Sequence, residues 1–195
     1  MKMKIKKITG LALMMILTIS AYTQEPKTVT DFYLAMPNSI NEIAETDSQS
    51  YPEDFFFGFT EKKESKAATI QRRKALIKIA DLKNGYLRLE SNQWEGWIEM
   101  SLFKKTNGTY LVAVSQTGCG PSCSGWIIFL THNKGKWTNV TESVFPDNFF
   151  SSLKYFKLPR VGTTIELICG DESGDECQKG KSLDEFKWNK TKFFK

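Results

Sequence analysis

The chain has 195 residues, with 27 Lys or Arg residues against 22 Asp or Glu residues and a formal net charge of +5. Residues 1–23 hold four of the lysines and no acidic residue, so the remainder has 23 basic against 22 acidic residues and a net charge near +1. Nucleic-acid-binding domains usually carry a clear basic excess that neutralises phosphates. The composition therefore argues against a nucleic-acid partner.

The amino end has the pattern of an export signal. Four lysines within the first seven residues precede a thirteen-residue apolar run from Ile8 to Ser20. This length suits a signal-peptide core but is short for the ~20 apolar residues that a membrane-spanning helix needs. Small residues at Ala21 and Thr23 allow cleavage after either position. We predict a signal peptide over residues 1–23 and an exported, periplasmic or secreted chain with no membrane span after cleavage; an uncleaved anchor helix is the alternative.

Short helices are predicted before residue 76. Asp31 is a candidate N-cap for a helical turn over residues 32–36, and Ser39 is a candidate N-cap for residues 40–45. The segment 61–74 is charged and contains alanines, which indicates a surface helix.

Residues 76–141 have the pattern of an antiparallel meander, because three Gly-containing turn segments separate stretches of strand-like residues. The apolar runs Tyr110–Val114 and Trp126–Leu130 do not alternate with polar residues, which predicts central strands covered on both faces. We expect the aromatic segment Tyr51–Phe59 to supply the covering layer. The expected strands are 76–80, 86–90, 97–105, 109–116, 125–132 and 136–141.

The remaining segments complete a mainly β fold. Residues 148–156 indicate a short helix or a packed loop, and residues 163–169 and 185–189 indicate a last pair of strands. We predict one globular domain over residues 24–195, an antiparallel meander of about eight strands with short N-terminal helices packed on it. An α+β arrangement is the alternative.

Four cysteines, Cys119, Cys123, Cys169 and Cys177, lie after the leader. An even number in an oxidising compartment predicts two disulfide bonds. Local pairing is favoured because each local pair flanks a Gly-containing loop; a crossed pairing stays open. Three residues separate the first two cysteines, so the pair departs from the two-residue spacing of thioredoxin-like redox motifs. The seven-residue spacer of the second pair argues against structural zinc.

No catalytic, cofactor or metal motif is recognisable. The one histidine, His132, precedes an Asn-Lys-Gly turn, which predicts a surface histidine, not a catalytic base. The acidic loop 171–176 lacks the alternating Asp order of a calcium loop, so a solvated turn is the better interpretation. We predict no catalytic residue, no cofactor and no bound metal.

Two tryptophans, Trp94 and Trp97, flank Gly96 ahead of a predicted strand. They are candidates for an exposed aromatic platform that binds a protein or an envelope glycan, and packing into the core is the alternative. Glu95 and Glu99 lie in the same segment and are the candidate carboxylates of a hydrolase.

The chain resembles a recurring group of small exported bacterial proteins. The resemblance rests on GCGPSCSG at residues 118–125, on GKWTNVT at residues 135–141 and on the opening DFYLAMP at residues 31–37. It extends over most of the chain after the leader. The group has no established activity, so the resemblance implies a bacterial exported protein and no site residues.

The sequence therefore predicts an exported, non-enzymatic β-rich domain that binds a protein or a cell-envelope component. A small carboxylate-dependent hydrolase and a purely structural envelope protein are the alternatives.

Overall fold

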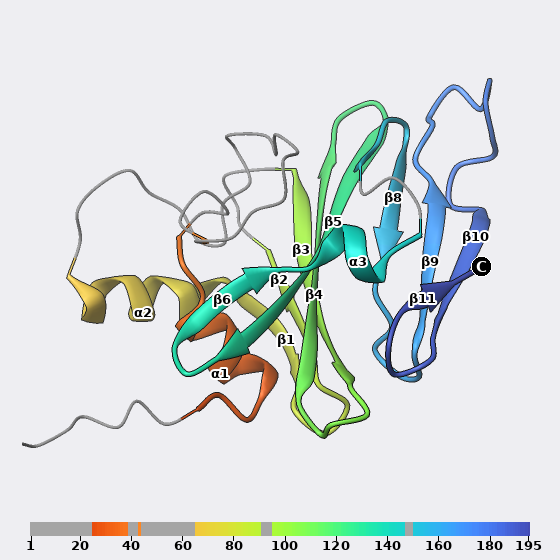
Figure 1. The fold of residues 1–195 in the computed structure, drawn as a ribbon. Helices are drawn as coiled ribbons and strands as arrows, with labels where there is room; N and C mark the ends of the chain where they lie inside the picture. The colour runs from red at the N-terminus through yellow and green to blue at the C-terminus, as the bar shows by residue number, and fades with distance from the viewer. Residues whose placement is uncertain (1–24, 39–42, 44–64, 91–94, 147–149) are drawn as a thin grey trace, which may run out of the picture.

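The computed structural model describes residues 25–38, 43, 65–90, 95–146 and 150–195. Within these residues the chain folds into two antiparallel sheets with three short helices (Figure 1). The predicted mainly β class is confirmed. None of the helices in the described ranges has the length and apolar character needed to cross a membrane.

The larger sheet is the predicted meander. Its first six strands pair in chain order, and β7 pairs with β5 beside β6. Glycines in the left-handed region make the turns, with φ of +83° at Gly108 and +80° at Gly135. The strands are β1 (Ile77–Asp81), β2 (Tyr86–Leu89), β3 (Gly96–Lys104), β4 (Tyr110–Cys119), β5 (Cys123–Asn133), β6 (Lys136–Asn139) and β7 (Phe150–Ser151).

The smaller sheet contains the C-terminal strands in the order β11-β10-β9-β8. The predicted last strand pair is present as β9 and β10, whose residues Ile165 and Phe186 lie opposite each other. The strands are β8 (Lys154–Lys157), β9 (Thr164–Cys169), β10 (Ser182–Trp188) and β11 (Phe193–Phe194).

The prediction of a helix or loop over residues 148–156 is wrong for the described part of that segment. β7 and β8 form there instead, joined by a tight turn in which Leu153 has a φ of +56°. Tyr155 and Phe156 lie in β8, and aromatic residues favour the half-buried surface of a sheet.

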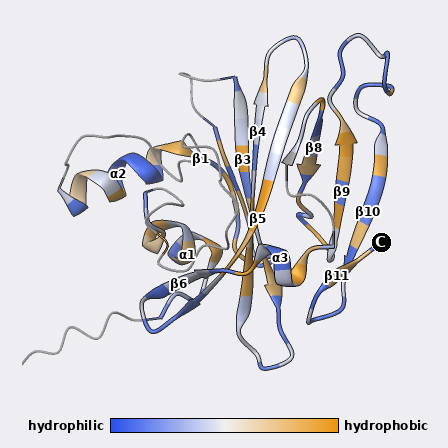
Figure 2. Cartoon of the chain, turned by 45° about the horizontal axis from the view of Figure 1, so that its top comes forward, coloured by the Kyte–Doolittle hydropathy of each residue, from blue (hydrophilic) through white to orange (hydrophobic). Residues whose placement is uncertain are grey.

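Both faces of the larger sheet are covered, which explains the apolar runs in β4 and β5. Successive side chains of a strand point to opposite faces. On one face, the Ser115 hydroxyl donates a hydrogen bond to the Phe156 carbonyl of β8 at 2.7 Å. On the other face, Phe32 makes edge contacts with the rings of Tyr110 and His132. Figure 2 shows hydrophobic residues concentrated on β5, β8 and β9.

The covering layers are thus the smaller sheet and the first helix, α1 (Val29–Ala35). The aromatic segment Tyr51–Phe59, which we expected in that role, lies outside the described residues. The prediction of a surface histidine at residue 132 is also wrong. The His132 side chain is only 6% exposed, and its ring lies 4.9 Å from the Trp137 ring. The side chain belongs to β5 and faces α1 instead of the turn.

Helices α1 and α2 each begin at a hydroxyl N-cap. Thr28, not Asp31, caps α1, and the Asp31 carboxylate completes a capping box by accepting the Thr28 N–H at 2.9 Å. Ser65 caps α2 (Lys66–Leu76), which confirms a surface helix there. A short α3 (Thr141–Val144) follows β6. The predicted helix over residues 40–45 lies outside the described residues except for Ile43.

Arg73 attaches α2 to α1. Its side chain is 2% exposed, and its guanidinium donates hydrogen bonds to four carbonyl oxygens and one amide oxygen. The last carbonyls of a helix have no partner within the helix, so a guanidinium at this position neutralises their partial charge. The acceptors are the carbonyls of Tyr33, Leu34, Met36 and Pro37 and the side chain of Asn38.

Candidate functional site

A pocket of about 590 Å³ opens where the two sheets meet. One wall comes from β2 and β3 of the larger sheet, and the other comes from the smaller sheet and its β8–β9 turn. Both acidic and basic side chains line it. The lining residues are Tyr86, Arg88, Glu99, Lys157, Leu158, Pro159, Arg160, Val161, Thr164, Glu166 and Glu185.

Glu99 is the buried carboxyl group of this pocket. It lies in the middle of β3 and is 4% exposed. One carboxylate oxygen accepts the Tyr86 hydroxyl at 2.5 Å, and the other accepts the Leu158 N–H at 3.1 Å. Burial raises the pKa of Glu99, and these hydrogen bonds offset part of that rise. Glu99 therefore ties β2 and β3 to the smaller sheet.

The register of the β2–β3 hairpin fixes the position of Tyr86. It lies opposite Ser101, two positions along from the pair formed by Arg88 and Glu99, and its side chain shares their face of the sheet. Burial is the main reason that the Tyr86 pKa is raised, and the neighbouring Glu99 charge adds to the effect. The hydroxyl therefore stays protonated and serves as a donor.

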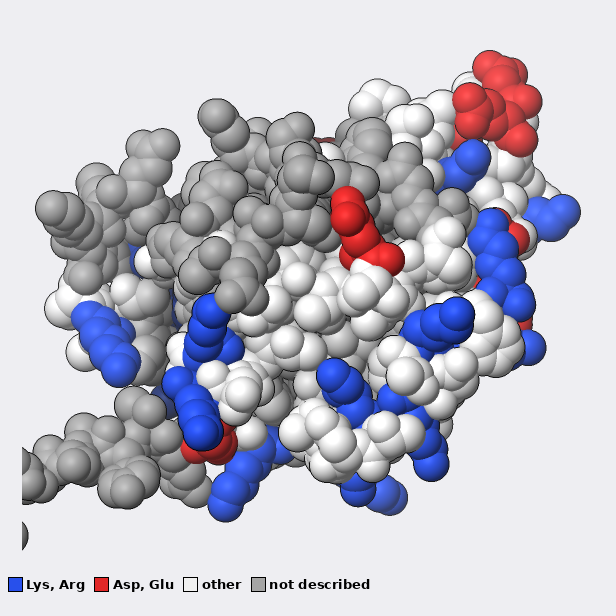
Figure 3. Space-filling model, in the orientation of Figure 1, with Lys and Arg blue, Asp and Glu red and all other residues white. Residues whose placement is uncertain are grey.

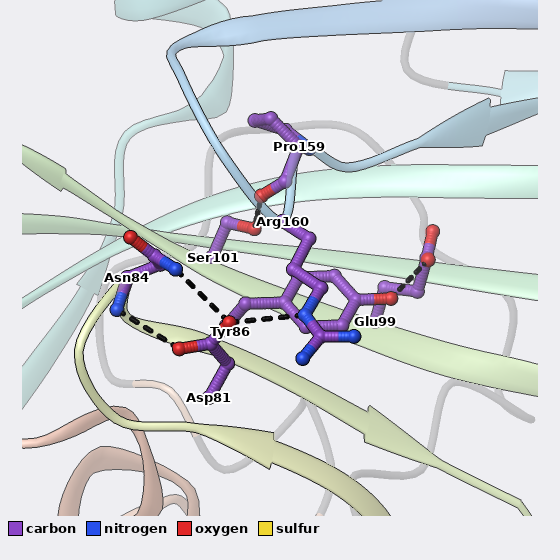
Figure 4. A network of polar contacts seen from close by, with 7 residues as sticks. All are labelled: Asp81, Asn84, Tyr86, Glu99, Ser101, Pro159 and Arg160. Carbon is purple, nitrogen blue, oxygen red and sulfur yellow. Dashed lines mark hydrogen bonds and ion pairs between the residues drawn. The ribbon is translucent and has the colours of Figure 1, made fainter.

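Further polar contacts join the sheets beside Glu99 (Figure 4). The Ser101 hydroxyl donates to the Pro159 carbonyl at 2.9 Å. Arg160 Nε lies 3.0 Å from Asp81 Oδ2, and Asn84 donates to the same carboxylate from its backbone and its side chain. The Asn84 hydrogen bonds, followed by Arg160, lower the pKa of Asp81.

The rim of the pocket carries paired charges. Arg88 Nε lies 2.8 Å from Glu90 Oε1, and Lys157 Nζ lies 2.9 Å from Glu166 Oε1. These groups are partly exposed, so each pair contributes little to stability. They are consequently available to exchange partners with a polar ligand.

The aromatic and acidic residues singled out in the sequence have separate surroundings. Trp94 lies outside the described residues. Trp97 is half-buried, with the Arg88 guanidinium 4.7 Å above its ring and the Tyr155 ring 5.5 Å away. Glu95 is exposed ahead of β3, whereas Glu99 is buried. Four residues of extended chain span about 13 Å, so Glu95 is not positioned to act with Glu99 on one bond.

The two disulfide bonds involve the end of β4, the start of β5 and the end of β9. These strand ends lie opposite the β8–β9 turn (Figure 1). Cys119 is joined to Cys123 and Cys169 to Cys177, the local pairing favoured by the sequence. The Cys123 N–H donates to the Gly170 carbonyl at 2.8 Å. A Cβ at residue 170 would lie 2.1 Å from the Cys123 carbonyl oxygen, so this contact requires glycine.

The acidic loop after β9 is organised by its own hydrogen bonds. Asp171 is buried, and its carboxylate accepts hydrogen bonds from Ser173 and from the Glu176 N–H. The Glu176 hydrogen bond is the main cause of the lowered Asp171 pKa. Across the described part of the chain, no three His, Cys, Asp or Glu side chains gather as metal ligands.

Sequence reasoning singled out Glu99 but missed its partners. The register of the β2–β3 hairpin could have identified Tyr86 and Arg88 as neighbours of Glu99, because both lie on one face of β2, just before its connection to β3. Leu158 and Lys157 carried no such signal. They reach the site because one sheet packs on the other. This packing brings together residues about 60 positions apart, such as Leu158 and Glu99.

No curated protein and no solved structure matches the chain. One family matches residues 21–161, which include β1 to β8 and the Glu99, Tyr86 and Lys157 side of the pocket. The match covers well over half of the 195 residues. The chain therefore belongs to the family described as "Protein of unknown function (DUF3256)".

Proposed function

We propose that this chain is an exported binding protein that takes a polar envelope glycan in the pocket around Glu99. The observation that carries the proposal is a buried carboxyl group, with a raised pKa, at the wall of an open pocket that is also lined by cations and anions. Ligand sites combine a concave shape with a few fixed polar groups, and perturbed pKa values cluster in them.

The lining favours a ligand rich in hydroxyl, amide and carboxylate groups. Arg88, Lys157 and Arg160 offer donors, whereas Glu166 and Glu185 offer acceptors. Sugars and amino sugars present both kinds of group on one small molecule. An apolar ligand would leave these charges without water and without partners, which is costly.

Binding accounts for the geometry better than hydrolysis does. Both oxygens of Glu99 already accept hydrogen bonds from the protein, so the carboxyl group fixes the wall of the pocket instead of facing a leaving group. The raised pKa of Glu99 is nevertheless the property that a general acid needs. A carboxylate-dependent hydrolase is therefore the second candidate, with Glu166 or Glu185 as the other acid.

Export is part of the proposal. It is supported by the Lys-rich start, by the apolar run that follows, and by two disulfide bonds, which persist in oxidising compartments. The mass of the protein recovered outside the cytoplasm tests it. We expect a product that begins near residue 24, and a product that retains Met1 and sediments with membranes would contradict export.

Calorimetric titration with soluble amino-sugar oligosaccharides released from bacterial cell wall tests the pocket. We expect the unmodified protein to bind and Arg88→Gln to bind about tenfold more weakly, since a hydrogen bond to a charged group contributes ~1.5–3 kcal/mol. Glu142→Gln on α3 is the matched control, because Glu142 is exposed and does not line the pocket.

The same titration separates the candidates. Equal affinity for Arg88→Gln and Glu142→Gln would overturn the pocket as the site. New reducing ends that appear during incubation with the unmodified protein, and vanish with Glu99→Gln, would favour the hydrolase.

A further inference from the structure

Five turns come together at the end of the molecule away from the disulfide bonds (Figure 1). We call residues 81–85, 104–109, 133–136, 158–163 and 189–192 the turn end. Hydrogen bonds hold its parts together: the Leu102 N–H donates to the Gly85 carbonyl, and Trp188 Nε1 donates to the Lys104 carbonyl. The ion pair between Arg160 and Asp81 joins the β8–β9 turn to the β1–β2 turn.

The turn end is strongly basic. It contains eight Lys or Arg residues and one acidic residue, Asp81. Glu25 and Lys27 line a hollow beside the β3–β4 and β5–β6 turns and add one charge of each sign. On the face drawn in Figure 3, the side chains along the lower part are mostly blue, the largest red cluster lies at the upper right, and smaller red groups lie at the centre and lower left. The cations are Lys83, Lys104, Lys105, Lys134, Lys136, Arg160, Lys190 and Lys192.

Two aliphatic side chains project from this basic surface. Leu82 is 55% exposed and Val161 is 75% exposed, the two highest values among the exposed large hydrophobic residues of the described chain. They occupy the β1–β2 and β8–β9 turns, next to the Asp81–Arg160 ion pair that joins those turns. No aromatic residue lies within the turn end.

We propose that the turn end attaches the protein to the surface of an anionic lipid bilayer. Lysines near a negatively charged membrane each add to its attraction. Aliphatic tips gain free energy by entering the boundary between headgroups and acyl chains, as the apolar face of an interfacial helix does. The acidic loop after β9 lies at the opposite end, so the charge distribution orients the molecule with its turn end toward the membrane.

The combination of groups favours lipid over nucleic acid. Single-stranded nucleic acids bind to basic surfaces that also offer aromatic rings for base stacking. The turn end offers exposed aliphatic tips instead. The proposal does not depend on the glycan pocket, because Leu82 and seven of the eight cations could be replaced without touching a residue that lines that pocket.

The test is sedimentation of the exported protein with large vesicles. One set contains phosphatidylcholine alone, and the other contains phosphatidylcholine with one third phosphatidylglycerol. The mass of the purified protein is measured first, because an uncleaved leader would bind both sets. We expect binding to the anionic vesicles only, with loss of binding on addition of high salt. Equal binding to both sets would overturn the proposal.

Variants locate the surface. Leu82→Ser should weaken binding about tenfold, and Lys105→Gln with Lys192→Gln should weaken it roughly 25-fold, or about fivefold for each lysine. The matched controls lie away from the turn end, on β10 and its preceding loop: Leu183→Ser, and Lys179→Gln with Lys181→Gln. Both controls should bind like the unmodified protein.

Two further outcomes would contradict the proposal. If the control lysines weaken binding as much as Lys105 and Lys192 do, the attraction is a property of overall charge. If single-stranded RNA binds more tightly than the vesicles and Leu82→Ser leaves that affinity unchanged, the turn end is a polyanion site. Far-ultraviolet circular dichroism of each variant confirms that a loss of binding is not a loss of fold.

Discussion

Two buried charged side chains, Arg73 and Glu99, lie on opposite faces of the larger sheet and are satisfied in different ways. Arg73 is enclosed between α1 and α2, where backbone carbonyls and one amide oxygen accept its hydrogen bonds. Glu99 lies between the sheets, holds one donor from each side, and also forms part of a pocket wall.

The difference separates a structural charge from a candidate functional one. An arginine keeps its charge under all ordinary conditions, so carbonyl dipoles can balance it permanently and the arrangement does not respond to pH. A carboxyl group with a raised pKa gains or loses its charge at a pH above the ordinary range of a glutamate. The face with Arg73 is therefore built for stability, whereas the face with Glu99 can respond to pH or to a ligand.

Removal of Arg73 should have the largest effect. Arg73→Ala leaves several buried carbonyls at the end of α1 without a donor, and we expect the free energy of unfolding to fall by about 3 kcal/mol or more. Arg73→Lys should recover only part of the loss, because an ammonium group cannot span all five acceptors. Urea unfolding followed by tryptophan fluorescence measures both.

The control for this variant is Lys74→Ala. Lys74 is the next residue of α2 and is exposed, so its removal should change the free energy of unfolding by less than about 0.5 kcal/mol. If Arg73→Ala and Lys74→Ala were equally stable, the carbonyl contacts of Arg73 would contribute nothing to the fold.

The sequence predicted the larger sheet well because its contacts are local. Turn glycines and alternating or continuous apolar runs fix each hairpin, so the strand order β1 to β6 follows from the chain itself. The smaller sheet was half predicted. β9 and β10 were expected, but β8 was not, because Lys154–Lys157 is only four residues long and the larger sheet that covers it is distant in sequence.

The candidate site was less predictable than the fold. Glu99 stood out only by its neighbouring tryptophans, and no local pattern distinguished it from the exposed Glu95. The role of Glu99 depends on Leu158, which approaches it through sheet-on-sheet packing. Likewise, the net charge near +1 hid the turn end, because its lysines are scattered along the sequence and gather only when five turns meet.

Loss of a disulfide bond should lower the free energy of unfolding by an intermediate amount. This variant probes the part of the molecule where the two sheets meet, as Glu99 does. The bonded loops connect one end of the two sheets through the Cys123 to Gly170 hydrogen bond. Cys123→Ser should lower the free energy of unfolding by about 2–3 kcal/mol, as for other short loops. The β-sheet signal in circular dichroism should remain, because the main cluster of buried hydrophobic residues contains neither Cys119 nor Cys123.

Cys177→Ser is the companion variant, since Cys177 is partly exposed whereas Cys123 is buried. We expect a smaller loss for Cys177→Ser than for Cys123→Ser. Peptide mapping without reductant should link Cys119 to Cys123 and Cys169 to Cys177. A fragment that links Cys119 to Cys169 would contradict the local pairing.

The smallest expected effect is the pH dependence that Glu99 adds to the stability of the fold. It is also the most direct test of the contrast between Arg73 and Glu99. The pKa of Glu99 in the folded protein lies above the ordinary glutamate value of 4.5, because burial disfavours the charged form. Folding thus favours the protonated carboxyl group. The stability that this proton contributes is complete below pH 4.5 and is lost as the pH rises through the folded-state pKa.

Glu99→Gln removes this titration while keeping the shape of the side chain. We expect the unmodified protein to lose stability relative to Glu99→Gln as the pH rises from 4.5 toward neutrality, which thermal unfolding at a series of pH values measures. Asp31, Asp81 and Asp171 have lowered pKa values and act in the opposite direction, but they are present in both proteins and cancel in the difference. Tyr86→Phe should enlarge the difference, because the Tyr86 hydroxyl is the hydrogen bond that most lowers the Glu99 pKa. A difference that is flat with pH would show that Glu99 is as inert as Arg73, and the distinction between the two faces would then rest on the pocket alone.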